Sequence, residues 1–342
     1  MKNFLLLLLC LAHISALADN HVATLQENGF DSSATLTVDS MIGERIASEK
    51  GLRILDIGNS FTDDAVAYLK RIADSSKTDL SNICIYKLMR PSASYKRFVD
   101  CYNGKDKGKF YYKKVVGDIE CPLTITSSAD KQNNQLLFKD VLTSYKWDKI
   151  VIHQLSNYSD DFERWLTNGD GGYLKELLDI IRKHQPNAEV GYLLPHVAFK
   201  QAENGNTKER WFNVMTSYQK LKDLYGVDFV IPYGTAIENL RTTVYNDEFG
   251  LCRDGHHIAF GLARYTAACA YYQSVLYPIS HKSILDNKCL YKTTSFEQGT
   301  STHSMPIDVT DENIDLANRC AYLACCFWWK ICNPADYENL FK

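Results

Sequence analysis

The segment Leu52–Ala65, with the sequence LRILDIGNSFTDDA, decides how the rest of the chain is interpreted. Its first part, LRILDI, is an apolar run typical of a short buried strand, and Gly58 and Asn59 are turn-forming residues. Helical spacing follows. Ser60 is therefore expected where a strand breaks sharply into a helix, beside N–H groups that can hold an anion. The segment alone leaves two interpretations open: Ser60 is a nucleophile, or Asn59 or Ser60 caps the helix.

Length and composition describe a globular protein without a basic footprint. The chain has 342 residues, of which 45% are hydrophobic and 23% are charged, and its formal net charge is -3. This length suits one large domain or two modest ones. Proteins that bind nucleic acids usually carry a strongly basic surface, so we expect no nucleic-acid partner.

The N-terminus predicts export. Lys2 precedes an apolar run, Phe4–Leu11, and Ala16–Ala18 supplies an A-x-A cleavage site. We expect a signal peptide over residues 1–18, too short to form a stable membrane span, and a mature protein that is periplasmic, on the cell surface or secreted. Lipidation at Cys10 is the alternative, although the leucines before it are larger than the residues that a lipidation signal prefers.

Ten of the 11 cysteines remain after the signal peptide is removed. An even number in an exported chain permits disulfides, whose connectivity the sequence does not define. Four of them fall within one predicted helix: Cys320, Cys325, Cys326 and Cys332. Their spacing matches no zinc motif and no histidine lies among them, so the pattern favours buried thiols or one or two bridges over a metal site.

Strand patterns alternate with helical patterns through most of the chain. The strand patterns cover residues 52–57, 82–88, 149–153, 188–194 and 228–231. Such alternation predicts a parallel sheet covered by helices on both faces, a three-layer α/β domain over residues 51–280. Ligands of these sheets bind beyond the carboxyl ends of the strands, which is where Ser60 is expected.

Three segments lie outside this alternation. Residues 19–50 are polar and aperiodic and are interpreted as an arm or linker. Residues 110–116 and 121–126 alternate apolar and polar side chains and predict a hairpin inserted at an edge of the sheet. Residues 281–342 are predicted to form a loop and then a helix, from about residue 308 to residue 331, that packs on the domain through its apolar side chains.

A second group of polar residues follows the last predicted strand. Asp254 and His257 are three residues apart, in the segment RDGHH. A carboxylate in this position can accept the Nδ1 proton of the imidazole and leave Nε2 free as a base, which beside Ser60 would deprotonate the hydroxyl. Asp254 could instead cap the following helix, with the histidines in solvent or on a metal. The chain should return to the sheet edge of Ser60 here, so the conjunction favours catalysis.

These motifs together resemble those of the SGNH, or GDSL-type, hydrolases. The matching segments are Ile57–Phe61 (IGNSF) and Asp254–His257 (DGHH), and Asp228–Ile237 and Gly261–Tyr265 extend the resemblance to roughly Leu52–Leu276. More narrowly, the chain is similar to a branch of exported bacterial proteins that carry I-G-N-S-F at the nucleophile.

The resemblance implies a flavodoxin-like three-layer α/β/α fold and hydrolysis of carboxylic esters without a metal or cofactor. Ser60 would be the nucleophile, His257 the base and Asp254 the residue that orients it. An oxyanion hole would combine the N–H of Ser60, the N–H of Ser92, which stands where a glycine is usual, and a side-chain amide. Either Gln154 or Asn157 could supply the amide, and Asn157 fits the register slightly better; both could also serve only to hold a loop.

Four other polar residues receive structural interpretations. His196 follows the fourth predicted strand and is favoured as a hydrogen-bonded loop residue over one that lines the crevice. Asp63 and Asp64 are expected to interact with the N-terminus of the first helix. Asp56, on the first strand, is interpreted as hydrogen-bonded structure.

The sequence thus predicts an exported serine esterase that acts through an acyl-enzyme. Export and the resemblance together favour the removal of acetyl groups from glycans, with a glycan ester or a small-molecule ester as the partner. A lipase or lysophospholipase of the same fold is one alternative. The other is a glycan-binding protein without activity on a degenerate hydrolase scaffold, although keeping Ser60, Asp254 and His257 together argues against a decayed site.

Overall fold

The computed structural model describes residues 51–123, 135–166 and 173–341, and the predicted signal peptide and arm lie outside these ranges. The described strands are β1 (Leu52–Gly58), β2 (Ile83–Met89), β3 (Phe110–Gly117), β4 (Gln135–Leu136), β5 (Lys149–Ile152), β6 (Glu189–Leu193) and β7 (Phe229–Ile231). They form one sheet in the order β4-β3-β2-β1-β5-β6-β7. Five strands, β2, β1, β5, β6 and β7, run parallel to one another, whereas β3 is antiparallel to β2 and β4 is antiparallel to β3.

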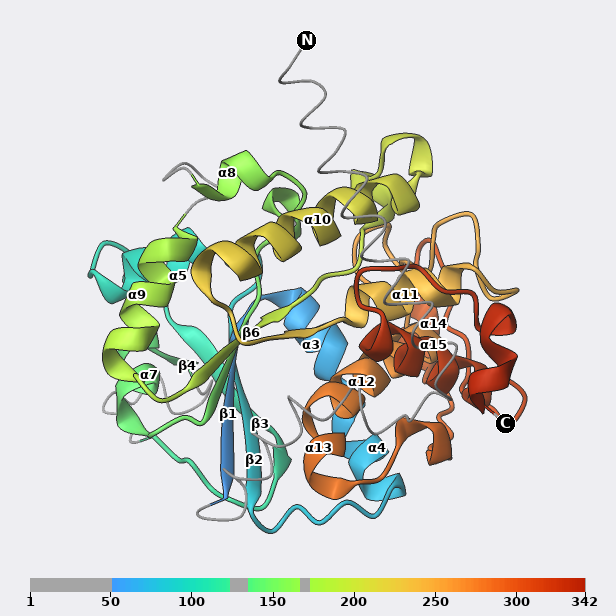
Figure 1. Ribbon diagram of the computed structural model, residues 1–342, viewed down its shortest axis with the longest axis horizontal. Coiled ribbons are helices and arrows are strands. Elements are labelled where there is room, and N and C mark those ends of the chain that lie inside the picture. The colour runs from blue at the N-terminus through green and yellow to red at the C-terminus, as the bar shows by residue number, and fades with distance from the viewer. Residues whose placement is uncertain (1–50, 124–134, 167–172, 342) are drawn as a thin grey trace, which may run out of the picture.

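Helices cover both faces of this sheet (Figure 1). One face carries α3 (Ser60–Val66), α4 (Leu69–Ser75), α11 (Tyr233–Arg241), α12 (Leu262–Val275) and α15 (Ile314–Cys326). The other carries α5 (Tyr95–Tyr102), α7 (Phe138–Ser144), α8 (Phe162–Leu166), α9 (Leu174–His184) and α10 (Thr207–Tyr225). The predicted three-layer α/β architecture with a mostly parallel sheet is confirmed.

Short helices complete the described chain. They are α13 (Tyr277–Ser280), α14 (Ser295–Thr300), η1 (Ser156–Tyr158), η2 (Phe199–Gln201), η3 (Glu203–Gly205), η4 (Ile284–Asp286) and η5 (Pro334–Phe341).

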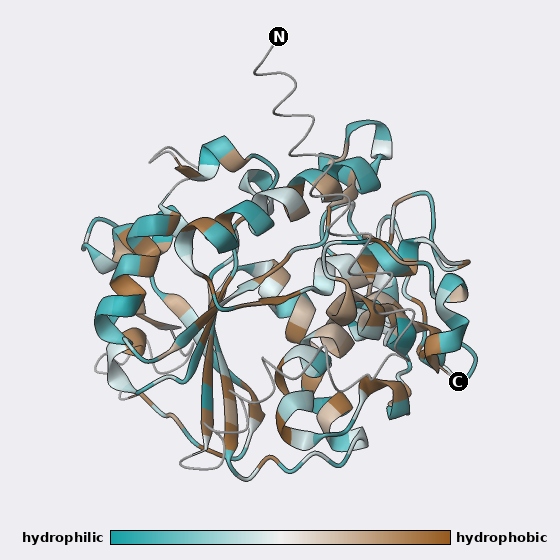
Figure 2. Ribbon diagram, viewed as in Figure 1, coloured by the Kyte–Doolittle hydropathy of each residue, from teal (hydrophilic) through white to brown (hydrophobic). Residues whose placement is uncertain are grey.

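The central strand β1 places its apolar side chains in two separate cores. Leu52 and Ile54 point to the face with α4 and α12, and Leu55 and Ile57 point to the face with α5 and α9. All four are fully buried. A strand buried on both faces is mostly apolar, which is why LRILDI is dominated by leucine and isoleucine. Figure 2 shows the same concentration of hydrophobic residues along the strands at the centre of the molecule.

The predicted edge hairpin is wrong in its second strand. Residues 110–116 do form the edge strand β3, but β3 pairs with β2, and its other neighbour is the two-residue β4. Cys121 is not in a strand because tyrosines take its backbone groups: its carbonyl accepts from the Tyr112 hydroxyl at 2.8 Å and its N–H donates to the Tyr86 hydroxyl at 3.1 Å. Residues 124–126 of the predicted strand lie outside the described ranges.

The predicted C-terminal helix is shorter than expected. It begins at Ile314 and ends at Cys326, and it packs on α11 and α12 through side chains such as Ala321. Before it, the Asn313 side chain donates to the Asp308 carbonyl and accepts from the Thr310 N–H, both at 2.9 Å. These bonds fold residues 308–313 into a turn rather than a first helical turn.

All ten described cysteines are free thiols, and nine of them are buried. The alternative of unbridged thiols therefore describes the C-terminal group, in which Cys320, Cys326 and Cys332 are buried and Cys325 is half-buried. One pair of thiols is in contact elsewhere: the Sγ atoms of Cys84 and Cys121 lie 3.5 Å apart.

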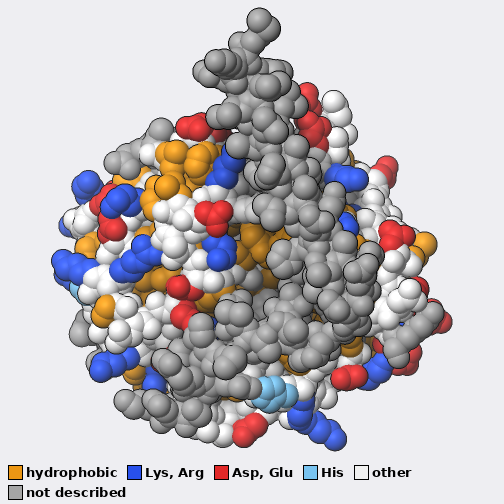
Figure 3. All heavy atoms as spheres, viewed as in Figure 1, with side chains coloured by type: hydrophobic (Ala, Val, Ile, Leu, Met, Phe, Trp, Pro, Cys, Tyr) orange, Lys and Arg blue, Asp and Glu red, His pale blue; other side chains and the backbone are white. Residues whose placement is uncertain are grey.

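The surface carries charges of both signs. On the face shown in Figure 3, lysine and arginine side chains are interspersed with aspartate and glutamate. In the part of the chain that the structure describes, no helix has the length and apolar character needed to cross a membrane.

Candidate active site

Ser60 is the first residue of α3, directly beyond the carboxyl end of the central strand β1. The preceding Asn59 caps this helix, because its Oδ1 accepts the Phe61 N–H at 3.1 Å. Gly58 makes the sharp turn possible: a Cβ at this position would lie 2.1 Å from the Thr62 Oγ1. Asn59 therefore supplies the cap, and Ser60 is left at the helix start, where backbone N–H groups lack intrahelical partners.

The structure brings Ser60 together with both residues of the Asp254–His257 pair. The His257 Nε2 lies 2.9 Å from the Ser60 Oγ, and the His257 Nδ1 lies 2.8 Å from the Asp254 Oδ2. Side chains 197 residues apart in sequence thus form one continuous chain of hydrogen bonds. The side chains of His257 and Asp254 are 24% and 39% exposed, so the group opens to solvent.

Asp254 is held by its own loop rather than capping a helix. Its Oδ1 accepts the backbone N–H groups of His256 and His257, at 2.9 and 2.7 Å, and α12 begins only at Leu262. Burial by itself would raise the pKa of Asp254, but the hydrogen bonds from the His257 side chain and from these two N–H groups outweigh it and hold the pKa well below its usual range. Asp254 is therefore ionised beside the imidazole.

The Phe61 ring packs among several histidines. Its centroid lies 4.2 Å from that of His196 and 5.5 Å from that of His257, where the contact is edge-on. Burial lowers the pKa of His196 well below its ordinary value and lowers the pKa of His153 to about 3. Both are therefore neutral. Because the Phe61 ring contacts His257 edge-on, it supports one side of the His257 imidazole.

His196 is a hydrogen-bonded loop residue, as favoured from the sequence. Its Nε2 lies 2.9 Å from the His256 carbonyl oxygen, to which it donates, and its Nδ1 lies 3.3 Å from the Tyr233 hydroxyl. The side chain is 1% exposed, so it supports the His256–His257 loop from inside the protein.

Ser92 lies in a tight turn close to the nucleophile. The Ala93 N–H donates to the Arg90 carbonyl at 3.0 Å, and Ser92 has a φ of 57°, in the left-handed region where glycine is usual. The Asn59 Nδ2 donates to the Ala93 carbonyl at 3.1 Å and ties this turn to the turn that carries Ser60. The structure thus brings the Ser92 segment beside Ser60.

The two candidate amides have different surroundings. Gln154 is fully buried, and its Oε1 accepts the N–H groups of Tyr95 and Leu155, at 3.1 and 2.9 Å, which joins it to the helix that follows the Ser92 turn. Asn157 lies on η1 with an exposed side chain, and its Oδ1 accepts from the Gln201 amide. Gln154 is therefore the more rigidly held of the two.

The acidic residues near Ser60 have partners that the sequence did not predict. Asp63 pairs with Lys87 on β2. Asp64 is fully buried and binds Arg253 and Arg264, which lie 189 and 200 residues further along the chain. Asp63 lies in the first turn of α3, as expected from the sequence, and the ion pairs of Asp63 and Asp64 are additional contacts that no local pattern in the sequence marks.

Asp56 is hydrogen-bonded structure, as interpreted from the sequence. It is fully buried on β1, and its Oδ1 accepts the Tyr271 hydroxyl at 2.7 Å, whereas its Oδ2 has no hydrogen-bond partner. Burial raises the pKa of Asp56 to about 7.

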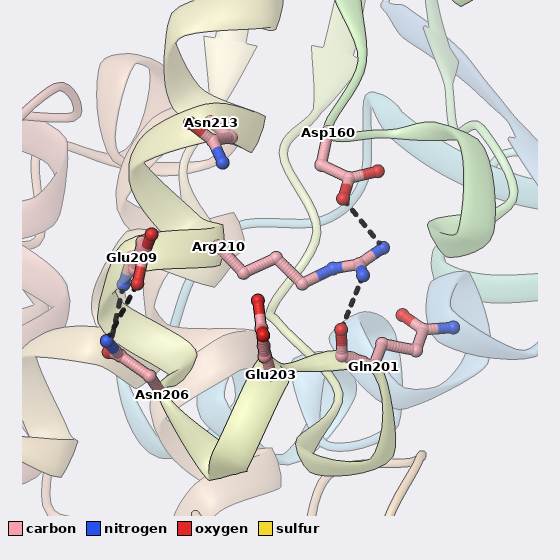
Figure 4. A pocket seen from close by; sticks show the side chains of 7 residues that line it. All are labelled: Asp160, Gln201, Glu203, Asn206, Glu209, Arg210 and Asn213. Carbon is pink, nitrogen blue, oxygen red and sulfur yellow. Dashed lines mark hydrogen bonds and ion pairs between the residues drawn. The ribbon is translucent and has the colours of Figure 1, made fainter.

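A polar pocket of about 270 Å³ lies between η2, η3, the start of α10 and Asp160 (Figure 4). Gly255 accepts the Lys200 N–H at 2.8 Å, and the next residue, Gln201, lines the pocket. All of the lining residues are polar or charged: Asp160, Gln201, Glu203, Asn206, Glu209, Arg210 and Asn213.

Arg210 crosses this pocket and organises it. Its guanidinium forms an ion pair with Asp160 at 3.2 Å and donates to the Gln201 carbonyl, as Figure 4 shows. Three of the lining side chains are carboxylates, but within the described ranges no three His, Cys, Asp or Glu side chains are grouped so that they could hold a metal ion.

The fold and this site define an α/β protein with a serine, a histidine and an aspartate linked at the carboxyl edge of a mostly parallel sheet. The chain belongs to the family described as "Domain of unknown function (DUF4886)", whose model matches residues 53–304 and so includes all three residues. It is similar to the crystal structure of a DUF4886 family protein from Bacteroides uniformis, solved at 1.50 Å resolution. The two share 23% identity, the TM-score is 0.62, and the match covers 84% of this chain and 99% of that one. No curated protein matches the chain.

Proposed function

We propose that this protein is a serine esterase of the SGNH, or GDSL-type, kind. The observation that carries the proposal is the continuous hydrogen bonding from Asp254 through His257 to Ser60, with contacts of 2.8 and 2.9 Å. This is the relation that a nucleophile, its base and the residue orienting the base need, and it recurs on unrelated folds because the chemistry demands it.

The mechanism follows from where the protons lie in this series of hydrogen bonds. Asp254 accepts the Nδ1 proton of His257, so Nε2 carries a lone pair toward the Ser60 hydroxyl. As the Ser60 Oγ attacks the ester carbonyl, Nε2 takes the hydroxyl proton and then gives it to the departing alcohol. Water, deprotonated by the same nitrogen, hydrolyses the acyl-enzyme and releases the acid and free Ser60.

The negative oxygen formed in each half of the reaction requires donors. The N–H of Ser60 lies at the start of α3, and the Ser92 turn adjoins it through Asn59. For the third donor both side-chain amides are candidates: the Gln154 oxygen is fixed by two backbone N–H groups but its side chain is fully buried, whereas the Asn157 side chain is exposed.

The topology supports the same family. The parallel strands have the order β2-β1-β5-β6-β7, which is the 2-1-3-4-5 order of flavodoxin-like sheets. Ser60 follows β1, at the point where the order reverses and where ligands of such sheets bind.

The substrate class that the surroundings favour is an acetylated glycan. The pocket that Arg210 crosses offers carboxylate acceptors and amide and guanidinium donors, and every residue that lines it is polar or charged. Sugar hydroxyls both donate and accept hydrogen bonds and suit this lining, whereas a long acyl chain requires an apolar groove. The lining therefore favours a carbohydrate deacetylase over a lipase or lysophospholipase, and it agrees with the export expected from the N-terminus.

Hydrolysis of p-nitrophenyl acetate by the mature protein and by Ser60→Ala tests the activity. We expect the variant to lose the activity down to the background rate, and equal rates for both proteins would contradict the proposal and favour a binding protein without activity. Acetate release from acetylated polysaccharides is then compared with hydrolysis of long-chain acyl esters. Faster hydrolysis of the long-chain esters would favour the lipase alternative.

A further inference from the structure

A single buried carboxylate, that of Asp64, joins the helix of Ser60 to a distant loop. Asp64 lies four residues after Ser60 on α3, so both are on the same side of this helix, and it is fully buried. One of its oxygens accepts the Ile258 N–H at 3.2 Å. The other lies 3.1 Å from the Arg253 Nη1 and 3.0 Å from the Arg264 Nε.

Two of these partners flank the Asp254–His257 pair in the sequence. Arg253 immediately precedes Asp254, and Ile258 immediately follows His257. The two ends of the loop are also bound to each other, because the Arg253 N–H donates to the His257 carbonyl at 2.9 Å and the Arg253 guanidinium donates to the Ile258 carbonyl. Asp64 therefore holds both ends of a closed loop.

The charges make this attachment rigid. The side chains of Arg253 and Arg264 are only 14% and 16% exposed, and both guanidinium groups lie over the Phe260 ring, 4.5 and 4.4 Å from its centroid. Leaving a buried charge without its partner strongly destabilises a protein, so separating either arginine from Asp64 costs a large free energy.

We propose that Asp64 is a positioning residue, which fixes the loop of Asp254 and His257 on the nucleophile's own helix. The separation of 2.9 Å between the Ser60 Oγ and the His257 Nε2 is then set by one carboxylate within one helical turn of the serine. This inference rests on the proposed esterase activity for its catalytic consequence, but the position of the loop can be tested without turnover.

The direct test is Asp64→Asn, which keeps the size of the side chain and removes its charge. Displacing a reacting group by about 1 Å can cost about 100-fold in rate, so we expect kcat to fall by about 100-fold while KM changes by less than about threefold. The number of active sites is counted from the burst of p-nitrophenol, and kcat is expressed per counted site.

A second variant tests the same attachment in case Asp64→Asn does not fold. Arg253→Gln removes the guanidinium that joins Asp64 to the loop but leaves the Asp64–Arg264 pair charge-balanced. We expect it to lower kcat per counted site by about tenfold. Glu297→Gln is the matched control, because Glu297 is a buried carboxylate whose described side-chain partners include Tyr68 and Tyr291 but no residue of the Asp254–His257 loop.

A purely structural role gives a different result. It would reduce the number of active sites and the melting temperature and leave kcat per counted site at the wild-type value, and this outcome for the variants at Asp64 and Arg253 would overturn the proposal. The Glu297→Gln control should behave in this way, with an unchanged kcat per site.

The NMR signal of the His257 Nδ1 proton reports directly on the position of the loop. In the wild type, the His257 Nδ1 proton is hydrogen-bonded to Asp254 and should be slow to exchange with water; it is assigned by its loss in His257→Gln. We expect this signal to broaden or disappear in the folded Asp64→Asn and Arg253→Gln proteins and to persist in Glu297→Gln. An unchanged signal in both loop variants would overturn the positioning role, whether or not Ser60→Ala shows that the protein hydrolyses esters.

Discussion

Replacing Asp254 with Asn should nearly abolish ester hydrolysis without unfolding the protein. In the wild type, Oδ1 of Asp254 accepts two backbone N–H groups and Oδ2 faces the His257 Nδ1. An asparagine must keep its oxygen on the two N–H groups, so its NH₂ group takes the place of Oδ2. Because this group donates, Nδ1 must accept, and the imidazole proton moves to Nε2.

The size of the loss follows from that change of tautomer. With its proton on Nε2, His257 donates to the Ser60 hydroxyl and no longer accepts its proton. In serine hydrolases with the same arrangement, the wrong tautomer lowers kcat by about ten-thousandfold, which corresponds to about 5 kcal/mol of transition-state stabilisation. The loop keeps its two backbone hydrogen bonds to residue 254, so the melting temperature should change little.

The assay is the steady-state hydrolysis of p-nitrophenyl acetate at pH 8, with thermal unfolding measured on the same samples. Asp63→Asn is the matched control, since it removes a carboxylate from α3 whose described ion-pair partner is Lys87 rather than His257. A kcat for Asp254→Asn within about tenfold of the wild type, in a folded protein, would refute the assignment of Asp254 as the orienting residue.

Three further predictions follow from the described contacts. Changing the amide that serves as the third donor to alanine should lower kcat by at least about 100-fold, whereas changing the other should lower it by less than about threefold, so Gln154→Ala and Asn157→Ala assign the role, and small effects of both would exclude a side-chain amide from the oxyanion hole. The pKa of Asp56 is about 7 in the native state and about 4 in the unfolded chain, so the contribution of Asp56 to native stability is largest below about pH 4 and falls by about 4 kcal/mol as the pH rises to 8. The difference in unfolding free energy between the wild type and Asp56→Asn, measured in urea, should follow this slope, and parallel pH profiles of the two proteins would contradict it. Cys84 and Cys121, with Sγ atoms 3.5 Å apart, should form a disulfide when the protein is treated with an external disulfide, which is reduced in turn, and peptide mapping without reduction would disprove this if it recovered both as free thiols.

The strands were the most predictable part of the fold. The expected segment 82–88 corresponds to β2 (Ile83–Met89), which is shifted by one residue toward the C-terminus. The expected segment 188–194 corresponds to β6 (Glu189–Leu193), which is one residue shorter at each end. Strands buried on both faces are rich in apolar residues, and such apolar runs are visible in a single sequence.

The edge of the sheet was less predictable. Residues 121–123 have the alternating pattern of a strand, but the backbone of Cys121 binds the hydroxyls of Tyr86 and Tyr112 instead of a neighbouring strand. Side chains that compete for backbone hydrogen bonds come from elements distant in sequence, so no local pattern can reveal them.

The sequence by itself determined the alternation of strands and helices, the turn that carries Ser60 and the spacing of Asp254 and His257, because each depends on residues that are close together in the chain. Only the tertiary structure decided which groups meet. It brought His257 to 2.9 Å from Ser60, joined Gln154 rather than Asn157 to the Ser92 segment, and tied Asp64 to arginines about 190 to 200 residues away. Pairing of buried charges and orientation of buried amides depend on distance in space, which a linear pattern does not contain.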